Sequence, residues 1–252
     1  MKITAIKTRK IAYPDDDLFG ILDKYLPAIK EKSIVAITSK IVSICEGRVI
    51  EIGKIDKNKL IEKEADFVLS SRKENKYGIM LTIKNNLLIP TAGIDESNGN
   101  GYYILWPENP QHSANEIREY LKKKFKLNSL GIIITDSKTT PLRWGTSGVA
   151  VVFSGFFPLN NYIGKKDVFG KRLNVTKANI YDSLAAAAVL VMGEGKEQTP
   201  LAIIEDVDFV KFKKKNPTAK ELKDLRISIN DDLYSPLLKS VKWKKGKENS
   251  AY

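Results

Sequence analysis

The sequence contains one cysteine, Cys45, and one histidine, His112, in 252 residues. A single cysteine excludes a disulfide within the chain, which fits a reducing compartment, and we predict a cytoplasmic protein. Cysteine and histidine are also too few for a zinc site, so a bound metal would be a hard cation with oxygen ligands. We interpret Cys45 as a packing residue and His112 as a structural or surface residue.

Long apolar runs are missing as well. No run reaches the roughly 18–20 residues of a membrane span, and residues 1–17 lack the apolar segment of a signal peptide, so we expect no membrane association. Positive charge is abundant: 42 Lys and Arg against 30 Asp and Glu, a net charge of +12. That charge suits an anionic partner such as a nucleotide or a phosphorylated metabolite. The lysine clusters at 121–126, 211–215 and 242–247 accompany no nucleic-acid motif, so we interpret them as solvated surface, with nucleic-acid binding as the less favoured alternative.

Helical and strand patterns are mixed along the chain. Apolar periodicity and end signals predict three helices, over 16–26, 115–126 and 179–193. We expect Ser113 to be the N-cap of the second helix and Gly193 to end the third. Unbroken apolar runs predict buried strands at the start of 33–44, in 130–137 and in 200–206. A regular βαβ repeat and a GxGxxG motif are both absent, which favours an α+β fold with mixed or antiparallel sheets over a doubly wound α/β fold. We place the main domain at 1–204, as one unit or two lobes, and an extension or dimer arm of that domain at 205–252.

The segment PTAGIDESNGNG (90–101) lies between two apolar stretches, 81–90 and 102–107. A hairpin turn needs only two to five residues, so this connection is longer than a turn requires. It is either an ordinary loop rich in turn-forming residues or a loop that presents Asp95 and Asn98 to a ligand.

Asp136 follows the apolar run IIIT and stands between Thr135 and Ser137. A carboxylate beside a hydroxyl suits Mg²⁺ or Mn²⁺, although Asp-Ser after a strand is commonly a turn or a helix N-cap. Asp95 also follows an apolar strand, so the two carboxylates could converge on one metal. Sequence spacing leaves this open.

Three further segments carry candidate residues. TSKIVSICEGR (38–48) puts Ser39 and Lys40 at the end of a strand, where Lys40 is either a phosphate ligand or a surface residue; no Walker A motif is present. TTPLRWGTSG (139–148) offers Arg143 as a clamp for a carboxylate or phosphate. Residues 165–167 form either an exposed functional loop or a plain hairpin.

The segments TSKIVSICEGR, TAGIDESN, IIITDS…PLRWG, NYIGKKDVFGKRL and DSLAAAAVLVMGEG…P occur together in one chain. Taken together they resemble the coenzyme F420-0:L-glutamate ligase family from about Asp15 to about Ile204, with a weaker match at INDDLYS (229–235). The resemblance implies a gamma-glutamyl-ligase-type fold and an intertwined homodimer. It also implies that GTP phosphorylates a carboxylate of the deazaflavin coenzyme precursor and that the amine of L-glutamate then attacks the acyl phosphate.

The resemblance also implies roles for individual residues. A divalent cation, Mg²⁺ or Mn²⁺, would be bound by Asp95, Asp136, Ser137 and Glu194, and K⁺ is a further candidate cofactor. GTP would contact Ile11, Ser39, Lys40, Asn98, Met192, Gly193 and Gly195. Arg143 would act in catalysis by binding an anionic group of the substrate.

Several residues depart from the family's pattern. Ile44 stands where the family usually has a lysine that contacts the nucleotide, Thr139 and Thr140 replace Gly-Arg, Leu142 replaces Trp, and Asn161 replaces Asp. The choice between GTP and ATP and the identity of the acceptor therefore stay open. The alternatives are a divergent paralogue that ligates an amino acid to another carboxylate acceptor and a non-catalytic nucleotide-binding protein.

Overall fold

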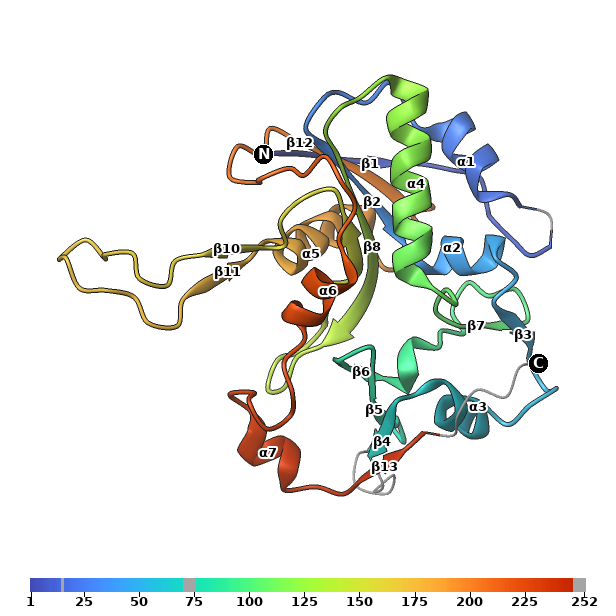
Figure 1. Cartoon of the computed structure of the whole chain (residues 1–252). Coiled ribbons are helices and arrows are strands. Elements are labelled where there is room, and N and C mark those ends of the chain that lie inside the picture. The colour runs from blue at the N-terminus through green and yellow to red at the C-terminus, as the bar shows by residue number, and fades with distance from the viewer. Residues whose placement is uncertain (15, 70–75, 247–252) are drawn as a thin grey trace.

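A five-stranded mixed sheet forms the centre of the molecule (Figure 1). The computed structural model describes residues 1–14, 16–69 and 76–246. Across the sheet the strands run in the order β1 (Lys2–Ile6), β12 (Leu201–Glu205), β2 (Ser33–Thr38), β8 (Leu130–Thr139) and β9 (Thr146–Ser154). β2 and β8 are parallel, and every other neighbouring pair is antiparallel. The predicted α+β class with mixed and antiparallel sheets is confirmed.

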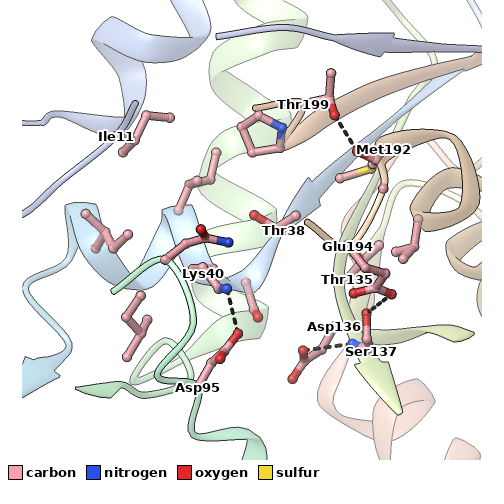
Figure 2. Close-up of a pocket in the computed structure, with 18 of the residues that line it drawn as sticks. Ile11, Thr38, Lys40, Asp95, Thr135, Asp136, Ser137, Met192, Glu194 and Thr199 are labelled. Carbon is pink, nitrogen blue, oxygen red and sulfur yellow. Dashed lines mark hydrogen bonds and ion pairs between the residues drawn. The ribbon is translucent and has the colours of Figure 1, made fainter. Parts of the chain in front are cut away.

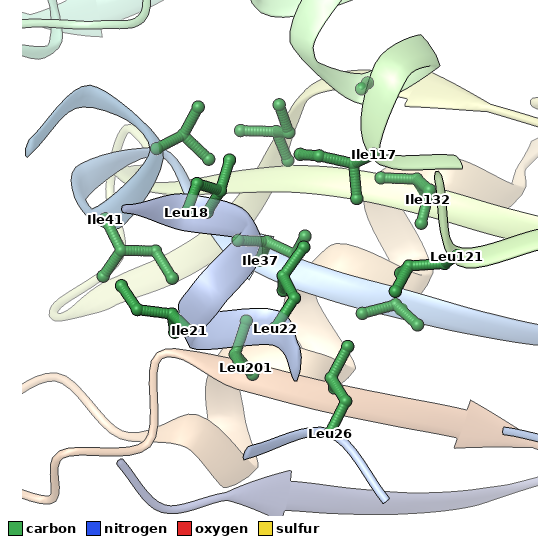
Figure 3. Close-up of a cluster of buried hydrophobic side chains, with 14 of the residues drawn as sticks. Leu18, Ile21, Leu22, Leu26, Ile37, Ile41, Ile117, Leu121, Ile132 and Leu201 are labelled. Atoms are coloured by element: carbon green, nitrogen blue, oxygen red, sulfur yellow. The ribbon is translucent and has the colours of Figure 1, made fainter. Parts of the chain in front are cut away.

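The central strands are buried on both faces, which accounts for their unbroken apolar runs. In β2, Val35 and Ile37 face one core cluster, whereas Ile34 and Ala36 face the other. The first cluster lies under the helices α1 (Leu18–Tyr25), α2 (Ser39–Cys45) and α4 (Pro110–Phe125). Figure 3 shows α1 laid over the strands, with Leu18, Ile21 and Leu22 pointing into this core. The second cluster is covered by α5 (Ile180–Met192).

Side-chain caps mark the start of several helices. Asp17 accepts a hydrogen bond from the N–H of Gly20 at the start of α1, and Asn179 caps α5 in the same way. The prediction that Ser113 caps α4 is wrong, because α4 begins at Pro110 and Asn109 accepts the bond from the N–H of His112. Proline suits the first helical position because its missing N–H has no helical partner there.

The apolar run 33–44 is strand only as far as Thr38. Ser39 and Lys40, predicted at a strand end, are the first residues of α2. Cys45 at the end of α2 is half-buried against the first core cluster, and burial raises the pKa of its thiol to about 12, in agreement with a packing role.

A smaller sheet with its own apolar cluster forms a second lobe. Its strands are β13 (Trp243–Lys245), β4 (Phe67–Leu69), β5 (Leu81–Lys84) and β6 (Leu87–Pro90). Around it lie α3 (Lys57–Glu64), the 3₁₀ turn η1 (Thr91–Gly93) and the ribbon of β3 (Val49–Glu51) with β7 (Tyr102–Ile104). The chain after α6 (Ala219–Leu225) and α7 (Ser235–Lys239) returns to this sheet as β13 (Figure 1).

Arg118 joins the C-terminal segment to the main core. Its side chain is fully buried, and its guanidinium donates to the carbonyls of Leu130 and Lys213 and to Oδ1 of Asn216, at 2.8, 2.8 and 2.6 Å. Val207 is buried against the core that α5 covers. The apolar cluster that α5 covers therefore includes residues from the C-terminal segment.

An arm projects from the body of the molecule (Figure 1). It is the antiparallel ribbon of β10 (Leu159–Asn161) and β11 (Lys177–Asn179) with the segment between them. Near its end, Val168 and Phe169 are 92% and 94% exposed. Residues 165–167 thus lie in an exposed hairpin. In the ranges that the structure describes, no helix is both long and apolar enough to cross a membrane.

Candidate functional site

The topology of the large sheet brings several chain segments to one edge. Because β2 and β8 are parallel, both run toward the same edge, where Thr38 lies opposite Thr135. β12 runs the other way and begins at this edge, with Leu201 opposite Ile37. β1 is antiparallel to β12 and ends there, with Ile6 opposite Leu201. The segments after β1 and β2, the far part of β8 and the loop before β12 therefore meet.

A cavity of about 760 Å³ lies at this edge, closed on its other side by the loop after β6. The volume is typical of a small-molecule site. Eleven of the twelve predicted site residues line it: Ile11, Ser39, Lys40, Asp95, Asn98, Asp136, Ser137, Met192, Gly193, Glu194 and Gly195. Arg143 lies outside the cavity, in the exposed turn between β8 and β9, so its catalytic role stays a prediction.

Asp95 and Lys40 form an ion pair across the cavity wall (Figure 2). The Lys40 Nζ lies 2.5 Å from Oδ2 of Asp95 and also donates to the carbonyl of Ser97 at 2.9 Å. The N–H of Ser97 donates back to Oδ1 of Asp95 at 2.8 Å. Burial raises the pKa of Asp95, but the Lys40 ammonium and the bonds from Ser97 outweigh it and hold that pKa below its usual value. Asp95 is therefore ionised at neutral pH.

Asp136 has the opposite electrostatic character. Burial raises the pKa of its carboxyl to about 6, and the nearby Asp95 carboxylate adds to the rise. Two bonds oppose it: the indole Nε1 of Trp106 donates to Oδ2 at 2.5 Å, and the N–H of Ser137 donates to Oδ1 at 2.8 Å. A buried carboxylate of this kind binds protons and cations readily, because either one neutralises its charge.

Glu194 and Asn98 connect the loop before β12 to the other walls. The Ser137 hydroxyl donates to Oε1 of Glu194 at 2.7 Å (Figure 2). The hydroxyl of Thr146 donates to the same oxygen at 3.3 Å. The side-chain amide of Asn98 donates to the carbonyl of Gly195 at 3.1 Å. The loop after β6 and the loop before β12, which are about a hundred residues apart in sequence, therefore touch each other over the cavity.

Asp16 fixes the segment around Ile11 through hydrogen bonds from Arg9 and Ala12. The buried Asp16 carboxylate accepts from the guanidinium of Arg9 and from the N–H of Ala12 at 3.0 Å. The N–H of Thr8 donates to the carbonyl of Gln198 at 2.8 Å. Asp16 is the first residue of the predicted helix 16–26, and the sequence carries no signal that it would accept bonds from the chain before it.

Trp106 is the other site residue that sequence reasoning missed. It reads as one more apolar residue in YYILWP, and its buried indole N–H is the only signal that it requires a polar partner. In the structure that partner is Asp136.

The oxygen donors of the cavity fit a hard divalent cation in their chemistry. Asp95, Asp136 and Glu194 supply carboxylates and Ser137 supplies a hydroxyl, all facing one cavity. Within the described residues, no three His, Cys, Asp or Glu side chains are grouped closely enough to hold a metal by themselves. Mg²⁺ commonly binds through one or two carboxylates and completes its shell with substrate phosphates and water, so the donors suit an ion that arrives with a nucleotide.

Comparison with known proteins agrees with these features. The sequence profile of the family described as F420-0:Gamma-glutamyl ligase matches residues 5–206. The chain is 34% identical over 226 residues to the coenzyme F420:L-glutamate ligase of Methanosarcina mazei, covering 83% of this chain and 88% of that protein. It is 35% identical over 236 residues to the protein of the same name from Methanococcus maripaludis strain S2, covering 88% and 93% of the two chains. The protein of that name from Methanocaldococcus jannaschii is 35% identical over 190 residues, 70% and 76% of the two chains.

Proposed function

The chain belongs to the F420-0:gamma-glutamyl ligase family, and from that premise we propose that it uses GTP to join L-glutamate to coenzyme F420-0, or to a related carboxylate acceptor. The new bond is an amide between the acceptor carboxylate and the amine of L-glutamate, and it is a gamma-glutamyl amide when that carboxylate is the γ-carboxylate of a glutamyl group. The observation that carries this proposal is the meeting of eleven predicted site residues around one cavity of about 760 Å³, large enough for a small-molecule site.

The chemistry requires two stages. The acceptor carboxylate attacks the γ-phosphorus of GTP, the bond from that phosphorus to the β-phosphate oxygen breaks, and GDP leaves. The amine of L-glutamate then attacks the acyl carbon, the bond to phosphate breaks, and the amine loses a proton as the amide forms. Each stage brings negatively charged groups together, so positioning and charge neutralisation supply most of the catalysis.

A divalent cation, Mg²⁺ or Mn²⁺, would neutralise the charge of the β- and γ-phosphates, and K⁺ is a further candidate cofactor. We assign its protein ligands to Asp95, Asp136, Ser137 and Glu194. Asp95 is ionised at neutral pH, and the ionised form of Asp136 prevails above its pKa of about 6. At pH 7 both carboxylates are therefore in the form that a cation requires.

The nucleotide would lie between the two loops that Asn98 and Gly195 connect. Ser39, Lys40, Asn98 and the segment 192–195 line that part of the cavity, together with Ile11. Lys40 is the cationic residue among these, and its ammonium forms an ion pair with Asp95. Ile44 also lines the cavity, so the wall at this position is apolar.

The exposed apolar side chains support a homodimer. Val168 and Phe169 on the arm, Leu142 and Trp144 on the turn between β8 and β9, and Leu190 on α5 are each between 82% and fully exposed. A monomer gains nothing from exposing large apolar groups on projecting segments, whereas a second copy would bury them.

Turnover with defined substrates tests the function. The purified protein is incubated with Mn²⁺, GTP, L-glutamate and coenzyme F420-0, and GDP and the glutamylated product are followed by chromatography and mass spectrometry. We expect product only when all four components are present, and much less of it with Asp136→Asn or Glu194→Gln. Replacing GTP by ATP determines the nucleotide.

Two results would replace the proposal. Turnover with a different carboxylic acid, and none with coenzyme F420-0, would identify a divergent paralogue. Metal-dependent GTP binding without ligation of any acceptor would identify a non-catalytic nucleotide-binding protein. Arg143→Ala is measured in the same assay, since Arg143 lies outside the cavity.

A further inference from the structure

The indole of Trp106 lies behind the cavity wall that carries Asp136. Trp106 is 1% exposed and does not line the cavity, and its Nε1 donates to Oδ2 of Asp136 at 2.5 Å. The other oxygen of Asp136 accepts from the N–H of Ser137 at 2.8 Å. Both carboxylate oxygens therefore have a donor, and together these donors restrict how the carboxylate can rotate.

Gly93 makes room for the indole. Its φ is +70°, and a Cβ at this position would lie 2.1 Å from Nε1 of Trp106. The 3₁₀ turn that leads to Asp95 is thus packed directly on the indole, because only glycine allows so close an approach. Trp106 therefore contacts both walls of the proposed metal site: the turn before Asp95 on one side and the carboxylate of Asp136 on the other.

A buried ion cluster holds Trp106 from behind. The Lys84 Nζ lies 5.5 Å from the centre of the indole ring, and it also lies 2.8 Å from Oε2 of Glu64. Arg48 contacts the same Glu64 oxygen at 2.9 Å and donates through Nε to the carbonyl of Trp106 at 3.2 Å. Both the ring and the backbone of Trp106 are thus fixed by charged groups that do not reach the cavity.

We propose that Trp106 is a positioning residue that orients the Asp136 carboxylate for the divalent cation. The inference rests on the proposed function, because it concerns the same metal site. A carboxylate that is already oriented loses little rotational freedom when a cation binds. Donors that orient metal ligands in this way typically account for about 10- to 100-fold in metal affinity.

The test removes the N–H of the indole without changing its shape. Trp106 is replaced by 3-benzothienylalanine, in which sulfur takes the place of the N–H, and separately by phenylalanine. Mn²⁺ affinity is measured by electron paramagnetic resonance in the presence of a GTP analogue that is not hydrolysed, so that no turnover is needed. We expect the dissociation constant for Mn²⁺ to rise at least about 10-fold in both variants.

Trp243→Phe is the matched control. It also removes an indole N–H bond, the one to the carbonyl of Leu238 at 2.7 Å, but Trp243 lies on β13 and does not line the cavity. Its affinity for Mn²⁺ should equal that of the wild type. In turnover, saturating Mn²⁺ should restore kcat of the Trp106 variants, while the KM for glutamate stays unchanged.

Three outcomes would overturn the proposed metal site or the role of Trp106. If the wild type binds no Mn²⁺ with the GTP analogue, the proposed metal site is wrong. If the wild type binds Mn²⁺ and the benzothienyl variant binds it equally well, the positioning role of Trp106 is refuted. If phenylalanine weakens binding and the benzothienyl group does not, the effect of Trp106 is packing alone, and the inference fails as well.

Discussion

Replacing Asp136 by asparagine should make stability less dependent on pH in the metal-free protein. Burial is the main reason that the pKa of Asp136 is raised to about 6, against the effect of the bonds from Trp106 and Ser137. At pH 7 the wild type therefore keeps a buried negative charge that the unfolded chain would expose to water. Asparagine removes that charge and has nearly the same volume.

The size of the effect follows from the pKa. The pKa of an aspartate in an unfolded chain is about 3.9, so folding raises the pKa of Asp136 by roughly 2 units. At about 1.4 kcal/mol per unit, the free energy of unfolding can change by at most about 3 kcal/mol through this group. Because the pKa of Asp136 is raised on folding, its contribution to the free energy of unfolding is fully present below about pH 4 and is lost as the pH rises through about 6. The Asp136→Asn variant should gain up to about 3 kcal/mol relative to the wild type between pH 4 and pH 7.

Urea denaturation at several pH values with EDTA present measures this difference. Asparagine also places an amide N–H opposite an existing donor, which costs about 1–3 kcal/mol, but that cost does not vary with pH. The change in free energy with pH therefore isolates the charge. Asp208→Asn, at an exposed position, is the control for the loss of an aspartate elsewhere in the chain.

Parallel curves for Asp136→Asn and the wild type would refute the reasoning, because they would mean that Asp136 does not titrate near 6 in the folded protein. Repeating the measurement with Mn²⁺ and a GTP analogue adds a second check. The wild type should gain stability from them as ligands that bind only the folded state. The variant should gain much less.

Three other perturbations have defined outcomes. Asn216→Ala removes a side-chain acceptor of the buried Arg118 guanidinium and should lower the free energy of unfolding by about 1–3 kcal/mol in urea. Gly93→Ala forces a Cβ to within 2.1 Å of the Trp106 indole and should cost at least about 1–3 kcal/mol, with a change in tryptophan fluorescence; wild-type stability and emission would mean that the indole lies elsewhere. Phe169→Ser at the 94% exposed arm position should weaken the proposed homodimer in sedimentation velocity, and an unchanged mass would exclude the arm from the interface.

Much of the local structure could be predicted from the sequence. The runs that become β2, β8 and β12 are apolar at every position because they are buried on both faces of the sheet, and that pattern is visible without any tertiary information. Gly193 ends α5 as predicted. The N-cap of α4 was misplaced because Ser113 and Asn109 are both good capping residues, and Pro110 rather than propensity decides between them.

The site could be predicted in its members but not in its geometry. The eleven predicted residues that line the cavity come from five separate segments of the chain. Arg143 lies outside the cavity in an exposed turn, and its role stays a prediction. Trp106 was not expected at all, although it lies within 2.5 Å of Asp136.

The sequence by itself determined the fold class, the restriction of any metal to oxygen ligands, and the candidate residues, because these depend on local pattern and residue chemistry. The tertiary structure alone decided which candidates meet. Contacts such as Lys40 with Asp95, Asn98 with Gly195 and Trp106 with Asp136 depend on strand order and on packing between distant segments. A periodic pattern shows which face of a strand is buried, but it does not show which other segment covers that face.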